Sequence, residues 1–267
     1  MNPILLLLLV VAAIIASLFG QGGGVFYTPL QAVFGVDFHN AATTSLFLIM
    51  VTSLSATLVY RKAHHTDWGM AIALEVPTTI GAFAGGLISD SIPAEILLIL
   101  LAILLVVSGL LMIRPIALKD KNRTESTHFW IWQRSQGGKS YSLNLLVITP
   151  IMIAVGMLTG MVGIGGGVLK VPAIVLLGGV PMEIAIGSSA FMVGITATAG
   201  LAGHLSVGHW DWHSAIVMGI GVFIGGQIGS RISVGLDKKK LKKLLGVFLL
   251  GVALFLMLRL LTQGPVA

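Results

Sequence analysis

The sequence predicts an all-α integral membrane protein of two inverted-topology repeats, each with three clear transmembrane helices plus a glycine-broken helix or hairpin. Three observations predict this fold: the composition, an internal duplication and the positions of the basic residues. Hydrophobic residues make up 56% of the 267 residues and charged residues 10%, so the chain cannot present a soluble surface. The chain has no Cys, which excludes disulfides and cysteine-based metal or catalytic sites.

A glycine-rich motif occurs twice, 143 positions apart, and each copy interrupts an apolar run. The shared residues are Gly20, Gly22, Gly23, Gly24, Val25 and Pro29 in the first copy, and Gly163, Gly165, Gly166, Gly167, Val168 and Pro172 in the second. After one inserted glycine near Gly179, the match continues 144 positions apart, for example from Thr52 to Thr196 and from Gly81 to Gly225. A duplicated membrane chain with a glycine break in each half points to a transporter with its site between the repeats.

Apolar runs of about 20 residues, long enough to span a bilayer, predict six clear helices. They lie near residues 41–60, 69–89, 94–114, 184–205, 212–234 and 241–262. Two more apolar runs, near 3–19 and 145–162, lead into the glycine motifs and are followed by short segments near 25–36 and 168–179. Each pair is either a full span plus a tilted short span or a re-entrant hairpin inside the protein, and both versions return the chain to the side it entered from.

Thirteen of the sixteen Lys and Arg residues lie in three loops, which the positive-inside rule places in the cytoplasm. The net charge of +6 therefore reports orientation and not a nucleic acid partner. The loop with Arg61 corresponds to the loop around His209, which has no Lys or Arg, so the halves are predicted to be inverted with both termini outside the cytoplasm. The predicted divisions are a first repeat at 1–114, a cytoplasmic linker at 115–144 and a second repeat at 145–267. A cleaved signal peptide over Ile4–Leu18 is disfavoured, because the run lacks a basic start and cleavage would remove part of the first motif.

The glycine motifs are candidate anion sites. Successive glycines permit positive φ angles, and their unpaired N–H groups, together with the start of the next helix, create positive potential. The alternative is that small residues only let helices pack closely, but two repeat-related clusters favour a site. The candidate binding residues in the motifs are Gln21, Gly22, Gly23, Gly24, Gly165, Gly166 and Gly167.

Hydroxyl residues near the predicted start of two spans form a second candidate layer. Side chains of this kind are natural helix N-caps and would also donate to sulfur or carboxylate oxygens. The residues are Thr43, Thr44 and Ser45 in the first half, and Ser188 and Ser189 with Gly187 at the equivalent positions of the second.

Two charged residues lie within predicted membrane segments. Lys170 follows the second motif, and an ammonium inside a bilayer costs at least a few kcal/mol unless it is paired or hydrated. A bound anion would offset that cost, and the alternative is a lysine that snorkels to the interface. Glu75, just before Pro77, is a candidate for proton coupling, for pairing with Lys170, or for a place at the membrane edge.

Other residue groups support structural roles. The cluster of His204, His209, Asp211 and His213 would suggest a metal, but its loop is matched around Trp68 and favours an interfacial belt, so no metal is predicted. A four-residue spacing of glycines predicts close helix contacts at Gly81, Gly85, Gly86, Gly225 and Gly229. No catalytic triad order, P-loop or paired catalytic carboxylates are found, so an enzyme is unsupported and no cofactor is implied.

The two motifs, GQGGGVFYTP and GIGGGVLKVP, followed by AATTSLF and AIGSSAF, resemble the TauE/SafE sulfite exporter family over nearly the whole chain. The resemblance implies a multi-pass permease of the cell (inner) membrane for a small sulfur-containing anion: sulfite, a sulfonate, sulfoacetate or thiosulfate. Combined with the repeats, it predicts a secondary transporter that works by alternating access, with the anion and the lipid bilayer as partners and a homo-oligomer left open. An anion channel is the main alternative, and a membrane enzyme or assembly factor is a third class.

Overall fold

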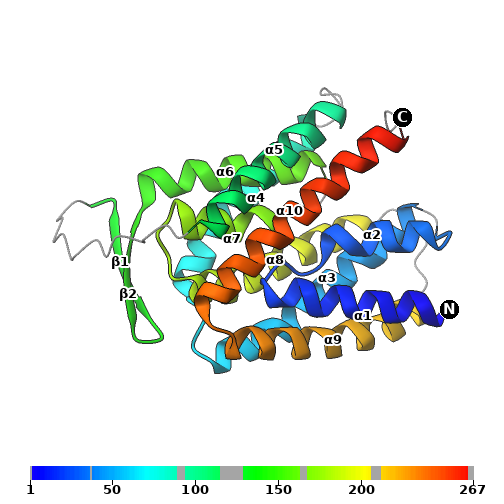
Figure 1. Ribbon diagram of the computed structural model, residues 1–267, viewed down its shortest axis with the longest axis horizontal. Helices are drawn as coiled ribbons and strands as arrows, with labels where there is room; N and C mark the ends of the chain where they lie inside the picture. The colour runs from blue at the N-terminus through cyan, green and yellow to red at the C-terminus, as the bar shows by residue number, and fades with distance from the viewer. Residues whose placement is uncertain are drawn as a thin grey trace. The chain divides into compact units, whose positions relative to one another are not determined.

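A computed structural model describes residues 2–36, 38–88, 94–114, 129–162, 167–205 and 212–263 (Figure 1). Over these residues the chain forms ten helices and one β-hairpin. The elements are α1 (Pro3–Leu18), α2 (Gly24–Val33), α3 (Phe38–Lys62), α4 (Trp68–Ile88), α5 (Ala94–Ile113), β1 (Ile131–Gln136), β2 (Lys139–Asn144), α6 (Leu145–Val162), α7 (Gly167–Leu176), α8 (Met182–Leu205), α9 (Trp212–Gly235) and α10 (Lys238–Gln263).

Helices occupy the positions of the six predicted spans, as α3, α4, α5, α8, α9 and α10, with ends within three residues of the predicted ones. Among the described residues, α3, α8, α9 and α10 contain stretches long and apolar enough to cross a membrane. The helices α2 and α7 have ten residues each, about 15 Å of helix, which is half of the roughly 30 Å hydrocarbon core. They are therefore short elements, too brief for an untilted crossing, as the sequence predicted.

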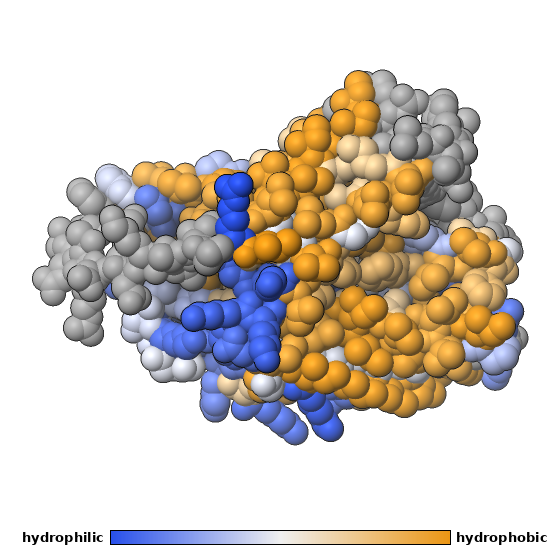
Figure 2. Space-filling view, viewed as in Figure 1, coloured by the Kyte–Doolittle hydropathy of each residue, from blue (hydrophilic) through white to orange (hydrophobic). Residues whose placement is uncertain are grey.

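Hydrophobic side chains cover most of the surface visible in Figure 2. Large ones are well exposed, including Leu7 at 64% and Phe83 at 71%. In water such exposure would be costly, at about 25 cal/mol per Å² of apolar area. The exposed apolar surface is the one expected of helices that face lipid.

Helix starts are fixed by amide and carboxylate side chains. The Asn2 Oδ1 accepts from the Ile4 N–H at 2.9 Å, and the Asp67 Oδ1 accepts from the Met70 N–H at 3.0 Å. In the second half Asn144 and Asp237 cap α6 and α10 in the same way. Asn and Asp are among the strongest N-cap residues, because their short side chains satisfy backbone donors that have no partner in the helix.

The β-hairpin departs from the predicted all-helical fold and lies at the end of the predicted linker. Gly137 and Gly138 both have positive φ, 55° and 74°, as a two-residue hairpin turn requires. On one face Trp132 pairs with Leu143, and the fully buried Leu143 places its Cδ2 3.2 Å from where a Cβ on Gly178 would lie. The hairpin thus packs on the turn after α7. The start of α6 and the end of α7 therefore lie close together.

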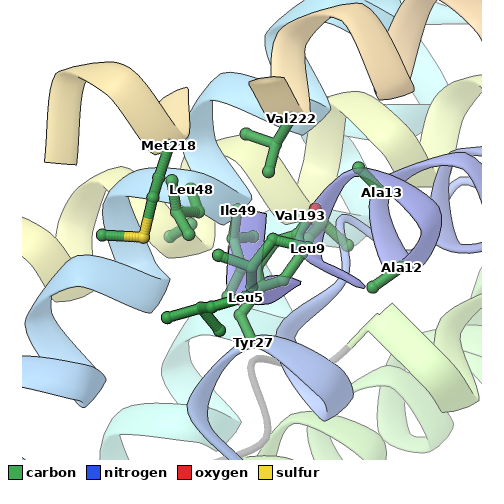
Figure 3. Packing of buried hydrophobic residues seen from close by; sticks show 11 residues of the cluster. Leu5, Leu9, Ala12, Ala13, Tyr27, Leu48, Ile49, Val193, Met218 and Val222 are labelled. Atoms are coloured by element: carbon green, nitrogen blue, oxygen red, sulfur yellow. The ribbon is translucent and has the colours of Figure 1, made fainter. Parts of the chain in front are cut away.

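The chain forms two compact units, and each combines parts of both sequence halves. The first unit contains residues 1–75, 164–167 and 183–235, and the second contains residues 76–163, 168–182 and 236–267. In the first unit α9 packs along both α1 and α3 (Figure 1). Its buried core gathers Leu9 and Tyr27 with Ile49, Val193 and Met218, from five different helices (Figure 3).

Glycines bring equivalent helix pairs into backbone contact in each unit. In the first unit a Cβ on Gly225 would lie 2.7 Å from the Val10 carbonyl oxygen of α1, and one on Gly229 would overlap the Ile14 carbonyl. In the second unit Cβ atoms on Gly81 and Gly85 would overlap the Ile153 and Met157 carbonyls of α6. The predicted close contacts at these four glycines are confirmed, and the two sets involve repeat-equivalent positions.

Helices that are equivalent in the two halves run antiparallel where they meet. In the first unit Ser53 of α3 lies against Gly194 of α8, while the earlier Leu46 lies against the later Gly200. In the second unit Gly109 of α5 approaches Gly246 and Leu250 of α10. The later Ile113 contacts only the earlier of these two, Gly246, so this pair is antiparallel too.

Candidate functional site

The first glycine break interrupts the chain between α1 and α2. Gly20, Gly22 and Gly23 have φ angles of 65°, 70° and 94°, and Gly23 is the left-handed residue immediately before α2. A residue with a Cβ pays roughly 1–2 kcal/mol in this conformation, so the glycines are needed by the backbone itself. The positive φ angles predicted from the motif are therefore confirmed.

Backbone N–H groups at this break are potential hydrogen-bond donors to a ligand. Within the described part of the chain, the N–H groups of Gly22, Gly23 and Gly24 donate to no backbone carbonyl. They lie at the N-terminus of α2, where the helix dipole is equivalent to about half a positive charge. Successive N–H groups in a left-handed turn form an anion-binding concavity.

Two buried side chains add donors at the break. Gln21 is 4% exposed and Ser53 is 1% exposed, yet the Gln21 Nε2 and the Ser53 Oγ have no hydrogen-bond partner among the described residues. The Ser53 hydroxyl lies 2.8 Å from where a Cβ on Gly22 would be. A buried polar group without a partner costs about 1–3 kcal/mol, and a bound acceptor would remove that cost.

Two apolar side chains pack closely against Gly22. The Val193 Cγ1 and the Ile49 Cγ2 would lie 2.6 and 2.9 Å from a Cβ on Gly22. Ile49 of α3 and Val193 of α8 are repeat equivalents, 144 positions apart, and both are buried (Figure 3). Sequence reasoning missed Ser53, Ile49 and Val193. The repeat offset relates Ile49 to Val193, and Ser53 lies one helical turn after Ile49.

The second glycine motif contacts the first at the residue where α7 begins. A Cβ on Gly167, the first residue of α7, would lie 2.5 Å from the Gln21 carbonyl oxygen and 3.0 Å from the Gln21 Cα. Gly167 and Gln21 belong to the same compact unit, so part of the predicted meeting of the two motifs is present. Gly165 and Gly166 lie outside the described residues.

The prediction that the hydroxyl residues are N-caps is wrong. Helix α3 begins at Phe38 and α8 at Met182, so all of these residues lie at least one turn inside a helix. No helix breaker separates Phe38 from the apolar run, and the helix continues upstream through the polar residues. The affected residues are Thr43, Thr44, Ser45, Ser188 and Ser189, with Gly187.

The buried hydroxyls bond between elements instead. The Ser189 Oγ donates to the Gly20 carbonyl oxygen at 3.0 Å and so holds the first break against α8. The Ser188 Oγ accepts from the Asp67 N–H at 3.0 Å, and the Ser45 Oγ accepts from the Gln31 Nε2 at 2.8 Å. Of these three bonds, that of Ser189 reaches the break, and Thr43 and Thr44 are also buried on α3.

The repeat-equivalent threonines have different partners. In the first half the Thr52 Oγ1 and the Tyr27 hydroxyl lie 2.7 Å apart. In the second half Thr196, which replaces Thr52, donates its hydroxyl to the Glu75 carboxylate. Glu75 is 3% exposed, so a carboxylate is buried in the first unit where it contacts a hydroxyl of α8.

Lys170 takes the position in α7 that Tyr27 has in α2, one turn after the start of the helix. It is fully buried. The snorkelling alternative is therefore wrong, because the side chain does not reach the surface.

The candidate metal cluster is described in part. His213 lies within the described residues, whereas His209, Asp211 and the side chain of His204 lie outside them. Among the described residues no group of three His, Cys, Asp or Glu could hold a metal.

Comparison with known proteins identifies the family. The family model described as sulfite exporter TauE/SafE matches residues 5–256. The chain belongs to this family. The TauE/SafE chain is also similar to proteins named "probable membrane transporter protein", and no solved structure matches it. Three such relatives are YunE of Bacillus subtilis, 27% identical over 92% of this chain and 94% of the relative; a protein of Xylella fastidiosa, 29% identical over 91% and 90%; and MJ0441 of Methanocaldococcus jannaschii, 24% identical over 96% and 95%. With its apolar spans, this TauE/SafE protein is a multi-pass membrane protein.

Proposed function

We propose that this TauE/SafE protein is a secondary transporter that moves a small sulfur-containing anion (sulfite, a sulfonate, sulfoacetate or thiosulfate) across the cytoplasmic membrane by alternating access. The observation that carries the proposal is the first break, where the N–H groups of Gly22 to Gly24 and the buried Gln21 Nε2 have no hydrogen-bond acceptor among the described residues. Such donors, placed at a helix N-terminus among apolar helices, bind an anion without needing a charged side chain. The names of the relatives favour transport over catalysis, and the family description favours a sulfur oxyanion.

The antiparallel contacts of α3 with α8 and of α5 with α10 support an inverted repeat. We assign residues 1–114 and 145–267 to the two repeats and 115–144 to a cytoplasmic linker that includes the hairpin. In transporters of this class, the two repeats exchange conformations to open the site to each side in turn. The side chains of Ile49 and Val193 close over Gly22, and their movement apart would open this break.

Flux into proteoliposomes tests the proposal. A transporter accumulates labelled sulfite or methanesulfonate above the external concentration when a proton gradient is imposed, because coupling supplies the free energy. An anion channel only equilibrates the label, whatever the gradient. A membrane enzyme or assembly factor gives the flux of protein-free liposomes, and that result contradicts the proposal.

Lys170 is proposed to pair with the bound anion. We expect Lys170→Met to weaken anion binding about tenfold to a hundredfold, because a hydrogen bond to a charged group contributes about 1.5–3 kcal/mol. Calorimetric titration of the purified protein measures this. The control is Lys139→Met, which removes an exposed lysine of the hairpin. Equal affinity of the Lys170 variant and the parent would remove Lys170 from the site.

Glu75 is proposed as the proton-coupling group, since a buried carboxylate in a membrane helix is the residue type that carries protons in such transporters. We expect Glu75→Gln to abolish accumulation driven by a proton gradient while anion exchange at equal pH continues, because the amide cannot release a proton. The control is Glu183→Gln, another buried carboxylate, in the first turn of α8. Gradient-driven accumulation that survives in the Glu75 variant would refute the assignment.

A further inference from the structure

The start of α10 carries a high density of positive charge. The segment 237–243 contains five lysines and one carboxylate, that of Asp237, so its net charge is +4. The Asp237 Oδ1 caps the helix, where it accepts from the Lys239 and Lys240 N–H groups at 3.0 and 3.2 Å. The positive end of a helix dipole repels lysines in the first turns. These lysines therefore lower the stability of the helix start, and a bound anion would offset that cost.

The neighbouring end of α5 adds to this positive charge. Ile113, the last residue of α5, lies against Gly246 of α10 in the second unit. Arg114 follows Ile113 and is exposed. Because the two helices are antiparallel, the carbonyl end of α5 offsets part of the α10 dipole, but Arg114 adds a full positive charge at the same end.

Two of the lysines lie on the side of α10 that faces lipid. Lys240 and Lys243 are exposed, and one helical turn further along Leu244 and Val247 are 46% and 56% exposed. Residues three, four and seven positions apart share one face of a helix. Figure 2 shows hydrophilic side chains over the start of α10, beside apolar ones. The buried side of the helix consists of Leu241, Leu245 and Leu249.

We propose that Arg114, Lys240 and Lys243 bind the headgroup of an anionic phospholipid, and that its acyl chains pack along Leu244 and Val247. The basic and the exposed apolar side chains are contiguous on one helix face, and a lipid is the ligand that uses both. The positive-inside rule assigns this end of the helix to the cytoplasm, where basic residues beside a membrane span attract anionic lipids. The site is separate from the glycine breaks and independent of the proposed function.

The thermal midpoint of the purified protein in a neutral detergent tests the site. We expect phosphatidylglycerol to raise the midpoint by roughly 5–10 °C at a hundred times its dissociation constant, because it binds only the folded protein. Phosphatidylcholine with the same acyl chains has no net charge, and glycerol phosphate has no acyl chains, so each should give a much smaller rise. Equal rises with the two lipids would overturn the role of the basic residues. An equal rise with glycerol phosphate would assign a small-anion site and overturn the lipid.

The double substitution Lys240→Gln with Lys243→Gln tests the residues. We expect it to weaken phosphatidylglycerol binding on the order of thirtyfold, since each basic residue at a membrane surface contributes about fivefold. The lipid-free midpoint should be unchanged or higher, because two charges that oppose the helix dipole are removed. A lower lipid-free midpoint, or an unchanged affinity for the lipid, would show that these lysines are not a lipid site.

Arg61→Gln with Lys62→Gln is the control with matched charge. These residues lie in the last turn of α3, where positive charge favours the helix dipole. We expect a lower lipid-free midpoint and an unchanged rise with phosphatidylglycerol. If both double variants lose the rise equally, any basic helix end attracts the lipid, and the site at α10 is refuted. Neither result affects the transport proposal, which the flux measurements test separately.

Discussion

Gly22→Ala is expected to reduce anion flux on the order of a hundredfold. The added Cβ would lie 2.6 Å from the Val193 Cγ1, 2.8 Å from the Ser53 Oγ and 2.9 Å from the Ile49 Cγ2, and the φ of 70° already disfavours any side chain. Overpacking costs about 1–3 kcal/mol and the left-handed backbone roughly 1–2 kcal/mol, and each 1.4 kcal/mol is a factor of ten. Initial uptake rates into proteoliposomes, at matched protein content, measure the loss.

Gly35→Ala separates the two causes. Gly35 follows α2 with a φ of 79°, and a Cβ there would meet no atom within 4 Å. The substitution therefore imposes the same backbone strain without the collision, and we expect a smaller loss of flux than in Gly22→Ala, about tenfold. Size-exclusion profiles of both variants establish that they are folded. If both variants lose flux equally, backbone strain is the cause, and the enclosure of Gly22 has no special role in transport.

The helices could be predicted from sequence because their signals are local. Apolar length located the six spans, and the glycine motif located the short helices α2 and α7 and the positive φ angles before α2. The duplication added information about residues that are far apart in the sequence. It matched Gly81 to Gly225, the spacing of the glycines predicted close helix contacts, and the structure has such contacts at both positions.

The details of the site could not be predicted, because they depend on side chains from different helices. Ser53 and Val193 carry no motif in the sequence, and their role depends on α3 and α8 placing both of them close to Gly22. The hydroxyl residues were assigned to helix starts because they lie near the beginning of two predicted apolar spans, but α3 begins at Phe38 and the serines bond across elements.

The hairpin was missed for a different reason. Its Gly137–Gly138 turn lies in a polar stretch, and the composition of that stretch was read as a linker. Exposed and buried residues alternate along β2, and this alternation places Leu143 in contact with Gly178. It was the sequence signal for a strand, and it was missed.

Gly229→Ala is expected to destabilise the first unit strongly, because its Cβ would overlap the Ile14 carbonyl of α1 and the Ser17 Oγ. A backbone atom cannot move aside as a side chain can, so α1 and α9 must separate and lose contacts along their length. With overpacking at about 1–3 kcal/mol and 2–4 °C per kcal/mol for a chain of this size, the thermal midpoint in detergent should fall by roughly 5–10 °C.

Gly251→Ala provides the control, since this glycine is in the helix α10 with no atom within 4 Å of its Cβ position. Alanine favours a helix by about 1 kcal/mol over glycine, so the midpoint should hold or rise. Gly85→Ala, at the equivalent position to Gly229, meets the Met157 carbonyl in the second unit and should fall like Gly229→Ala. A drop at only one of the two would mean that the halves share a sequence pattern but not the same dependence on close packing. Equal midpoints for Gly229→Ala and Gly251→Ala would show that α1 and α9 tolerate separation, and the glycines would then need another explanation, such as sliding of these helices during transport.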